Sequence, residues 1–157
     1  MKQHVRTKLL GNYGEAIAKK LLLSAGFDSV RDLNEDRMNH PYGDFYAVKD
    51  EVAYIISVRT RNKLQKNGRL NPSYNFRKKS ADVEAIAAGL RAVPAWLAIQ
   101  IDVKAQRYCA YFGTMAELNV FGDRYSIPMT EKATNGYICL AKNEFDDVIP
   151  AEWDNGA

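Results

Sequence analysis

The chain has 157 residues, of which 46% are apolar, and its 22 basic and 19 acidic side chains give a net charge of +3. This length suits a single core, and we expect one domain over residues 1–157 that ends in a short acidic tail. No apolar run is long enough to span a membrane, and the first fifteen residues lack the apolar stretch of a signal peptide. We therefore expect a cytoplasmic protein with no membrane partner.

The first half of the chain predicts a helix followed by three strands. Apolar residues recur at helical spacing between Val5 and Ala25, and Gly26 is placed to end the helix. Residues 27–33 can form a short strand, and the turn formers of 34–43 predict a flexible connection. Residues 44–48 and 52–60 are rich in β-branched and aromatic side chains, which predicts an antiparallel hairpin with a tight turn.

The second half predicts a loop, two helices and four strands. The polar segment 62–76 is interpreted as a long loop, and Ser80 is expected to cap a helix that ends before Pro94. Further strands are expected at 95–101 and 107–113, a short helix at 114–120, and edge strands at 127–129 and 136–141. This order of helices and strands predicts an α/β sandwich around a mixed sheet.

The predicted hairpin would gather polar side chains on one face. A turn centred on Asp50 and Glu51 places Asp44 opposite Ser57, and alternate residues of a strand share a face, so Arg59 would point the same way. Carboxylates in such a position can hold Mg²⁺ on a phosphate while a nearby cation stabilises charge.

These residues resemble the PD-(D/E)XK, or restriction-endonuclease-like, nuclease superfamily, which includes Holliday junction resolvases. The family has a helical Glu, an Asp at the start of a strand, and an acid-x-Lys triplet on the next strand. The matching segments are GNYGEAIAKKLLLSAGF with Glu15, PYGD with Asp44, and IISVRTR with Ser57 and Arg59. The resemblance covers roughly residues 8–115. It implies a restriction-endonuclease-like fold, catalytic roles for these four residues, and Mg²⁺ held by Asp44 and Glu15.

The acid-x-Lys triplet is degenerate in this chain, where it reads Ser57-Val58-Arg59. A serine is neutral and binds Mg²⁺ poorly, and an arginine stabilises phosphate charge but scarcely acts as a general base. Three hypotheses follow. The protein is a Mg²⁺-dependent endodeoxyribonuclease with a rearranged or eroded site, or a catalytically inactive module with the same fold that binds DNA or a protein, or an unrelated small interaction domain that binds an acidic partner.

A basic segment follows the hairpin and predicts nucleic acid as the partner, and the nuclease resemblance implies DNA. No acidic residue lies between Glu51 and Asp82. Aromatic rings among such cations suit phosphate contacts together with base stacking. The alternative interpretation is an ordinary solvated charged surface. By analogy with nucleases that cut two strands, we also expect a homodimer. The residues expected to bind nucleic acid are Arg61, Lys63, Lys66, Arg69, Tyr74, Arg77, Lys78 and Lys79.

Other reactive side chains give weaker signals. Cys109 and Cys139 lie far apart without C-x-x-C spacing, so we expect reduced core thiols and no zinc site. Gln100 could reach the site from a neighbouring strand or satisfy buried backbone.

Overall fold

The computed structural model describes residues 3–33, 43–62, 73–118, 120–121 and 123–149. Most of the predicted connection 34–43 lies outside these ranges, as do residues 63–72 of the predicted loop, which include Lys63, Lys66 and Arg69. The acidic residues of the tail beyond position 149 also lie outside them.

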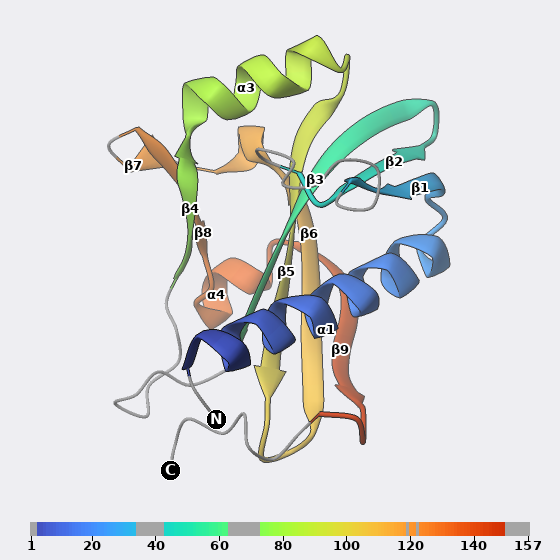
Figure 1. The fold of residues 1–157 in the computed structure, drawn as a ribbon, viewed down its shortest axis with the longest axis vertical. Helices are drawn as coiled ribbons and strands as arrows, with labels where there is room; N and C mark the ends of the chain where they lie inside the picture. Colours follow the sequence, from blue (N-terminus) through green and yellow to red (C-terminus); the bar gives the residue numbers. More distant parts are fainter. Residues whose placement is uncertain (1–2, 34–42, 63–72, 119, 122, 150–157) are drawn as a thin grey trace.

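The structure is built from two sheets and a small number of helices (Figure 1). The larger sheet has the order β1-β2-β3-β5-β6-β9 and the smaller sheet the order β4-β8-β7. The larger sheet consists of β1 (Asp28–Asp32), β2 (Phe45–Lys49), β3 (Val52–Asn62), β5 (Val93–Asp102), β6 (Arg107–Thr114) and β9 (Ile138–Phe145). The smaller sheet consists of β4 (Ser73–Lys79), β7 (Val120–Phe121) and β8 (Arg124–Pro128). The helices are α1 (Gln3–Ser24), α3 (Ser80–Gly89), the 3-10 turn η1 (Met115–Glu117) and α4 (Glu131–Thr134).

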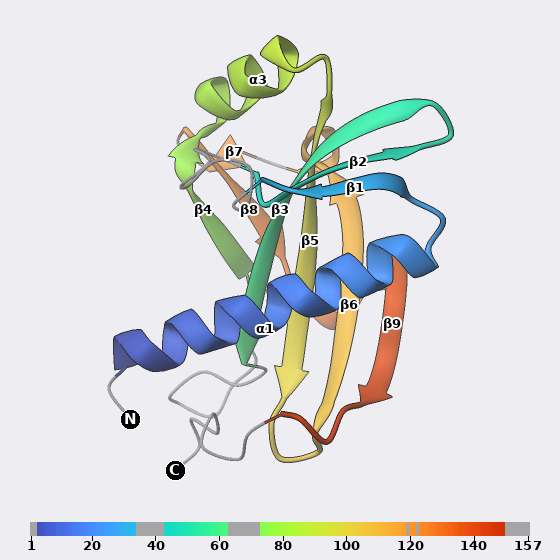
Figure 2. The same cartoon turned by 45° about the vertical axis from the view of Figure 1, so that its right-hand side comes forward.

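The larger sheet is mixed, because β3 and β5 run parallel while its other neighbouring strands run antiparallel. Helix α1 crosses it in front of β3, β5 and β6, and α3 lies towards one end of the molecule (Figure 2). The predicted α/β architecture around a mixed sheet is confirmed. Among the described residues, no helix is long and apolar enough to cross a membrane.

Two hydrophobic cores lie on opposite faces of the larger sheet. One core packs Ile17 and Leu22 of α1 against residues such as Ile56. The other packs Tyr74 and Phe76 of β4, together with α3 and β8, against residues such as Ile55. Because successive strand residues point to opposite faces, β3 is covered on both sides.

The predicted hairpin of β2 and β3 is confirmed, with Val48 paired to Ala53. Asp50 and Glu51 have φ values of 51° and 67°, as expected for a two-residue turn whose twist matches that of the flanking strands. The expected stop of α1 is also present, because Gly26 has a φ of 90°.

Several other predictions are wrong in detail. Residues 73–76, the last part of the loop predicted at 62–76, instead begin the strand β4. Ser80 is the first residue of α3, and the preceding Lys79 makes no side-chain cap. The predicted edge strand at 127–129 belongs to β8, which lies in the middle of the smaller sheet. Cys109 and Cys139 are free thiols, but Cys109 is only half-buried and Cys139 is exposed, so neither is the core thiol that was expected.

Candidate active site

Helix α1 lies directly on β3 at Gly14, and this contact places the next residue, Glu15. A Cβ atom on Gly14 would lie 1.7 Å from Oγ1 of the buried Thr60. Only a glycine allows the helix to approach the strand this closely. The position of Glu15 over the sheet therefore depends on the absence of a side chain at position 14.

Asp44 is held by β1 and β3 just before β2 begins. The Leu33 N–H donates to the Asp44 carbonyl at 2.9 Å, and the Asp44 N–H donates to the Ile56 carbonyl at 2.8 Å. Its carboxylate Oδ2 accepts a hydrogen bond of 2.7 Å from the Val58 N–H. These bonds fix both the backbone and the side chain of Asp44.

Gly43 allows Asp44 to sit at this point. A Cβ atom on Gly43 would lie 2.3 Å from Cγ1 of Ile55, a side chain with no exposed surface. Gly43 thus lets the backbone pack against the core, and Asp44 places its carboxylate at the edge of that core.

The structure brings Glu15 and Asp44 together, although they come from different elements. Glu15 is half-buried, and its pKa is raised to about 7 by burial, by the charge of Asp44, by a hydrogen bond with the Asp44 side chain, and by the charge of Asp32. Asp32 was not singled out from the sequence. Its position could have indicated a role, because Asp32 ends β1 and pairs with Phe45. Phe45 is the neighbour of Asp44.

This carboxylate pair fits Mg²⁺, which proteins commonly hold through one or two carboxylates together with waters and substrate phosphates. Within the described parts of the chain, no group of three or more His, Cys, Asp or Glu side chains could hold a metal ion. Glu15 and Asp44 would therefore supply the protein ligands, and the remaining ligands would be waters or a phosphate.

Ser57 lies where the acid of the family triplet is expected. The last backbone pair between β2 and β3 is Phe45 with Ile56. Asp44 lies one residue before this pair, so it is outside the ladder. The Asp44 carboxylate reaches the Val58 N–H instead of pairing regularly with Ser57. The Ser57 side chain is 0% exposed, and its hydroxyl is without a hydrogen-bond partner in the described structure. The catalytic role predicted for Ser57 does not fit this burial.

We expect Ser57→Ala to leave any activity unchanged and to keep or raise stability by up to about 1 kcal/mol, because it removes an unpaired buried hydroxyl. Ser126→Ala is the matched control, since Ser126 is also buried but has a polar partner, and we expect it to destabilise by about 1 kcal/mol. Urea denaturation and an activity assay would measure both effects. A large activity loss in Ser57→Ala would show that substrate reaches the hydroxyl.

Arg59 and Arg61 point from β3 towards the aromatic rings of β4. The Arg59 guanidinium lies 4.6 Å from the centre of the Phe76 ring, and the Arg61 guanidinium lies 5.8 Å from the centre of the Tyr74 ring. Both rings are buried, with 1% of Tyr74 and 2% of Phe76 exposed. The prediction that Tyr74 stacks on a nucleic-acid base requires an exposed ring, and the structure contradicts it.

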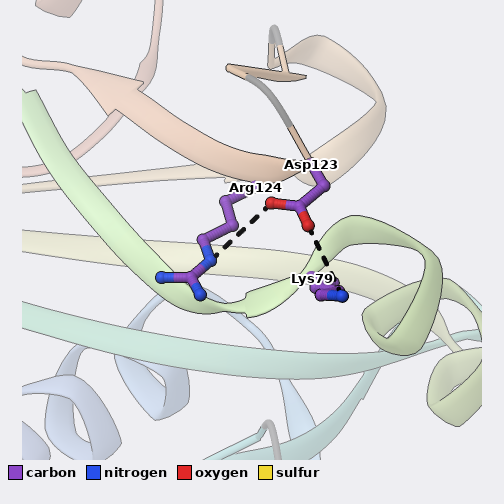
Figure 3. Close-up of polar contacts among 3 residues, drawn as sticks. All are labelled: Lys79, Asp123 and Arg124. Atoms are coloured by element: carbon purple, nitrogen blue, oxygen red, sulfur yellow. Dashed lines mark ion pairs between the residues drawn. The ribbon is translucent and has the colours of Figure 1, made fainter.

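The last residues of the predicted basic surface lie on β4 and at its end. Arg77 and Lys78 belong to β4. Lys79 is exposed and forms an ion pair of 3.7 Å with Asp123, which also lies 3.8 Å from Arg124 (Figure 3). An exposed ion pair of this kind contributes little to stability. Little stability would therefore be lost if Lys79 left Asp123 to bind a phosphate.

The layers and strand order define an α/β protein with the mixed six-stranded sheet of the restriction-endonuclease-like fold. A solved structure with this arrangement is that of Hjc, a Holliday junction resolvase from the archaeal hyperthermophile Archaeoglobus fulgidus. It aligns with a TM-score of 0.57 and 17% sequence identity over 82% of this chain and 95% of that chain. At this identity the likeness concerns the fold. No protein-family model matches the sequence, and no curated protein is similar to it.

Proposed function

We propose that this protein is a Mg²⁺-dependent nuclease that acts on DNA through a rearranged active site. The observation that carries the proposal is the contact between Glu15 and Asp44 on a nuclease-like fold. Two carboxylates in contact repel each other once both are charged, and this repulsion destabilises the folded protein. Such pairs are therefore found mainly where a function requires them.

In this proposal the chain's own residues do three things. The Val58 N–H orients the Asp44 carboxylate, and Asp44 with Glu15 forms an anionic site beside β3. Arg59, fixed against Phe76, supplies positive charge for the phosphate. The cation, when bound, polarises the phosphodiester and lowers the pKa of a water molecule.

A second candidate function is a nuclease-fold module that binds DNA without cutting it. It is favoured by the neutral, fully buried Ser57 at the position of the family acid. A site with two carboxylates instead of three holds a divalent cation less tightly, because ligand charge contributes to affinity.

The two functions separate when purified protein is incubated with branched, single-stranded and duplex DNA in Mg²⁺ or Mn²⁺. We expect cleavage that requires the cation and is abolished by Asp44→Asn, while Asp82→Asn, which changes an exposed acid on α3, retains it. Titration calorimetry should show cation affinity at least tenfold weaker in Asp44→Asn, since one of two carboxylate ligands is lost. Binding of DNA without cleavage in any cation would instead support the second candidate.

A further inference from the structure

The residues that follow β9 are fixed between α1 and the turn that joins β5 to β6. On the side of the turn, the Asp146 N–H donates to the Gln106 carbonyl at 2.8 Å. The Gln106 side chain donates from Nε2 to the carbonyls of Asp147 and Ile149, at 3.3 Å and 3.2 Å (Figure 2). On the side of α1, the Tyr13 hydroxyl donates to Asp146 Oδ2. The segment therefore holds the helix and the turn together.

We call residues 146–149 the clamp, because the core and its own hydrogen bonds keep it in place. Ile149 is 1% exposed and belongs to the core that α1 covers. The Val148 N–H donates to Asp146 Oδ1 at 3.0 Å. Both carboxylate oxygens of Asp146 thus accept a hydrogen bond, one from the clamp itself and one from Tyr13. The acceptor that Tyr13 reaches is therefore held in a fixed orientation.

Tyr13 and Glu15 lie on opposite flanks of the contact that Gly14 makes with β3. Successive residues of an α-helix are about 100° apart around its axis. Because Gly14 faces Thr60 of β3, its two neighbours point to the two sides of this contact. A rotation of α1 about the contact moves both of these side chains at once. The bond between Tyr13 and Asp146 therefore also fixes the direction in which Glu15 points.

The core alone does not fix this turn of α1 on both sides. In the part of the helix whose burial is described, residues 9–24, every buried side chain lies after Glu15. On the other side, Gly11 and Gly14 have no side chain that could pack. Tyr13 lies between these glycines and supplies the polar anchor there. The buried side chains after Glu15 are Ile17, Ala18, Leu21 and Leu22.

We propose that Tyr13 and Asp146 are positioning residues for the candidate cation site, which hold Glu15 against Asp44 through the clamp. The inference rests on the proposed function and adds the segment after β9 to the parts of the chain on which the site depends. Groups of a functional site have to be held within about 0.5 Å of their productive positions. Releasing this helix turn should therefore weaken cation binding although both carboxylate ligands remain.

The first test measures the Mn²⁺ affinity of the DNA-free protein by titration calorimetry at pH 8, where Glu15 has mostly lost its proton. Tyr13→Phe keeps the ring and removes the hydrogen bond to Asp146. We expect it to bind about tenfold more weakly, as is usual when an outer partner of a metal ligand is lost. In a Glu15→Gln background the same substitution should have almost no effect on affinity, because coupled residues are not additive. Additive losses would overturn the positioning role.

The matched control is Tyr125→Phe, because the Tyr125 hydroxyl donates to Glu84 Oε1 at 2.8 Å, between β8 and α3. Each substitution removes one bond from a tyrosine to a carboxylate, so both should lower the Tm by a few degrees. Only Tyr13→Phe should lose Mn²⁺ affinity. Equal Mn²⁺ affinities of the two variants would mean that Tyr13 acts on stability alone, and the inference would fail.

Amide hydrogen exchange without any cation tests the positioning independently of metal binding. The α1 amides around Glu15 should exchange about three- to tenfold faster in Tyr13→Phe than in the wild type, and at the wild-type rate in Tyr125→Phe. Gln106→Ala, which frees the clamp from the β5–β6 turn and leaves the tyrosine in place, should accelerate the same amides to a smaller extent. Unchanged exchange around Glu15 in both clamp variants would overturn the inference.

The outcomes for this inference and for the proposed nuclease activity are distinguishable. If DNA is not cleaved but Tyr13→Phe changes cation affinity and exchange as expected, the proposed catalysis fails and the positioning role stands. If the wild type cleaves DNA and Tyr13→Phe matches it in Mn²⁺ affinity and in exchange around Glu15, the proposed activity stands and the positioning role fails.

Discussion

Gly14→Ala is expected to lower the free energy of unfolding by about 3 kcal/mol, at the upper end of the usual cost of overpacking a core. The new methyl group would lie 1.7 Å from Thr60 Oγ1 and 2.7 Å from Thr60 Cβ, so helix α1 has to move away from β3. For a chain of this size, such a loss corresponds to a fall in Tm of about 10 °C. Urea denaturation and thermal melting would measure it.

Gly11→Ala is the matched control in the same helix. A Cβ atom on Gly11 would have no atom within 4 Å, and replacing an exposed glycine inside a helix by alanine should stabilise the protein by about 0.5–1 kcal/mol. The double variant Gly14→Ala/Thr60→Ala should recover part of the loss, because it removes the closest colliding atom. Equal effects of the two single glycine variants would contradict the direct contact between α1 and β3.

Because Gly14 precedes Glu15, the same substitution should also weaken the site. Moving α1 separates Glu15 from Asp44, so the remaining folded Gly14→Ala protein should bind divalent cations more weakly than the wild type. If Glu15 and Asp44 hold the cation as proposed, one contact between a helix and a strand links stability to cation affinity.

The hairpin could be predicted from the sequence because its signals are local. A two-residue turn fixes the pairing of Val48 with Ala53, and a helical stripe with a glycine stop fixes α1. The approach of Glu15 to Asp44 followed only from the family resemblance. No local sequence pattern predicts that Glu15 on a helix and Asp44 just before a strand will lie in contact.

The sequence did not predict β4 because its strand character depends on tertiary packing. The alternation of Tyr74 and Phe76 with polar residues is typical of a half-buried strand, but the dense cations around it suggested a solvated loop. These rings become buried only once β4 pairs with β8, which lies about fifty positions later in the chain. The burial of Ser57 could not be predicted for the same reason, because the elements that cover β3 lie outside the hairpin.

The stability of the protein should fall as the pH rises from about 4.5 to 7, and Glu15 is the cause. Burial and the neighbouring Asp44 and Asp32 raise the pKa of Glu15 from 4.5 to about 7. The folded state therefore binds the Glu15 proton more tightly than the unfolded state does. This contribution to stability is fully present below the unfolded pKa and is lost as the pH rises through the folded pKa. For a half-exposed carboxyl we expect a loss of about 1–2 kcal/mol.

Glu15→Gln isolates this effect because glutamine keeps the shape of the side chain and cannot ionise. Relative to the wild type, the variant should gain about 1–2 kcal/mol of stability at pH 8 and almost nothing at pH 4.5. Asp44→Asn should reduce the pH dependence as well, since it removes a charge that raises the Glu15 pKa. Urea denaturation at a series of pH values would measure the stability of both variants. If the stability of Glu15→Gln depended on pH as steeply as that of the wild type, Glu15 would not be the cause.

A divalent cation should reverse the loss at high pH. Above pH 7 Glu15 has mostly lost its proton, and a cation that binds only the folded state stabilises it by mass action, by about 2.7 kcal/mol at a hundred times its Kd. Mg²⁺ or Mn²⁺ should therefore raise the Tm of the wild type at pH 8 and have little effect at pH 5, where Glu15 keeps its proton. Glu15→Gln, which keeps one of the two carboxylates, should show a much smaller rise at pH 8. Equal rises in both proteins would mean that the cation binds elsewhere and that Glu15 is protonated for a structural reason alone.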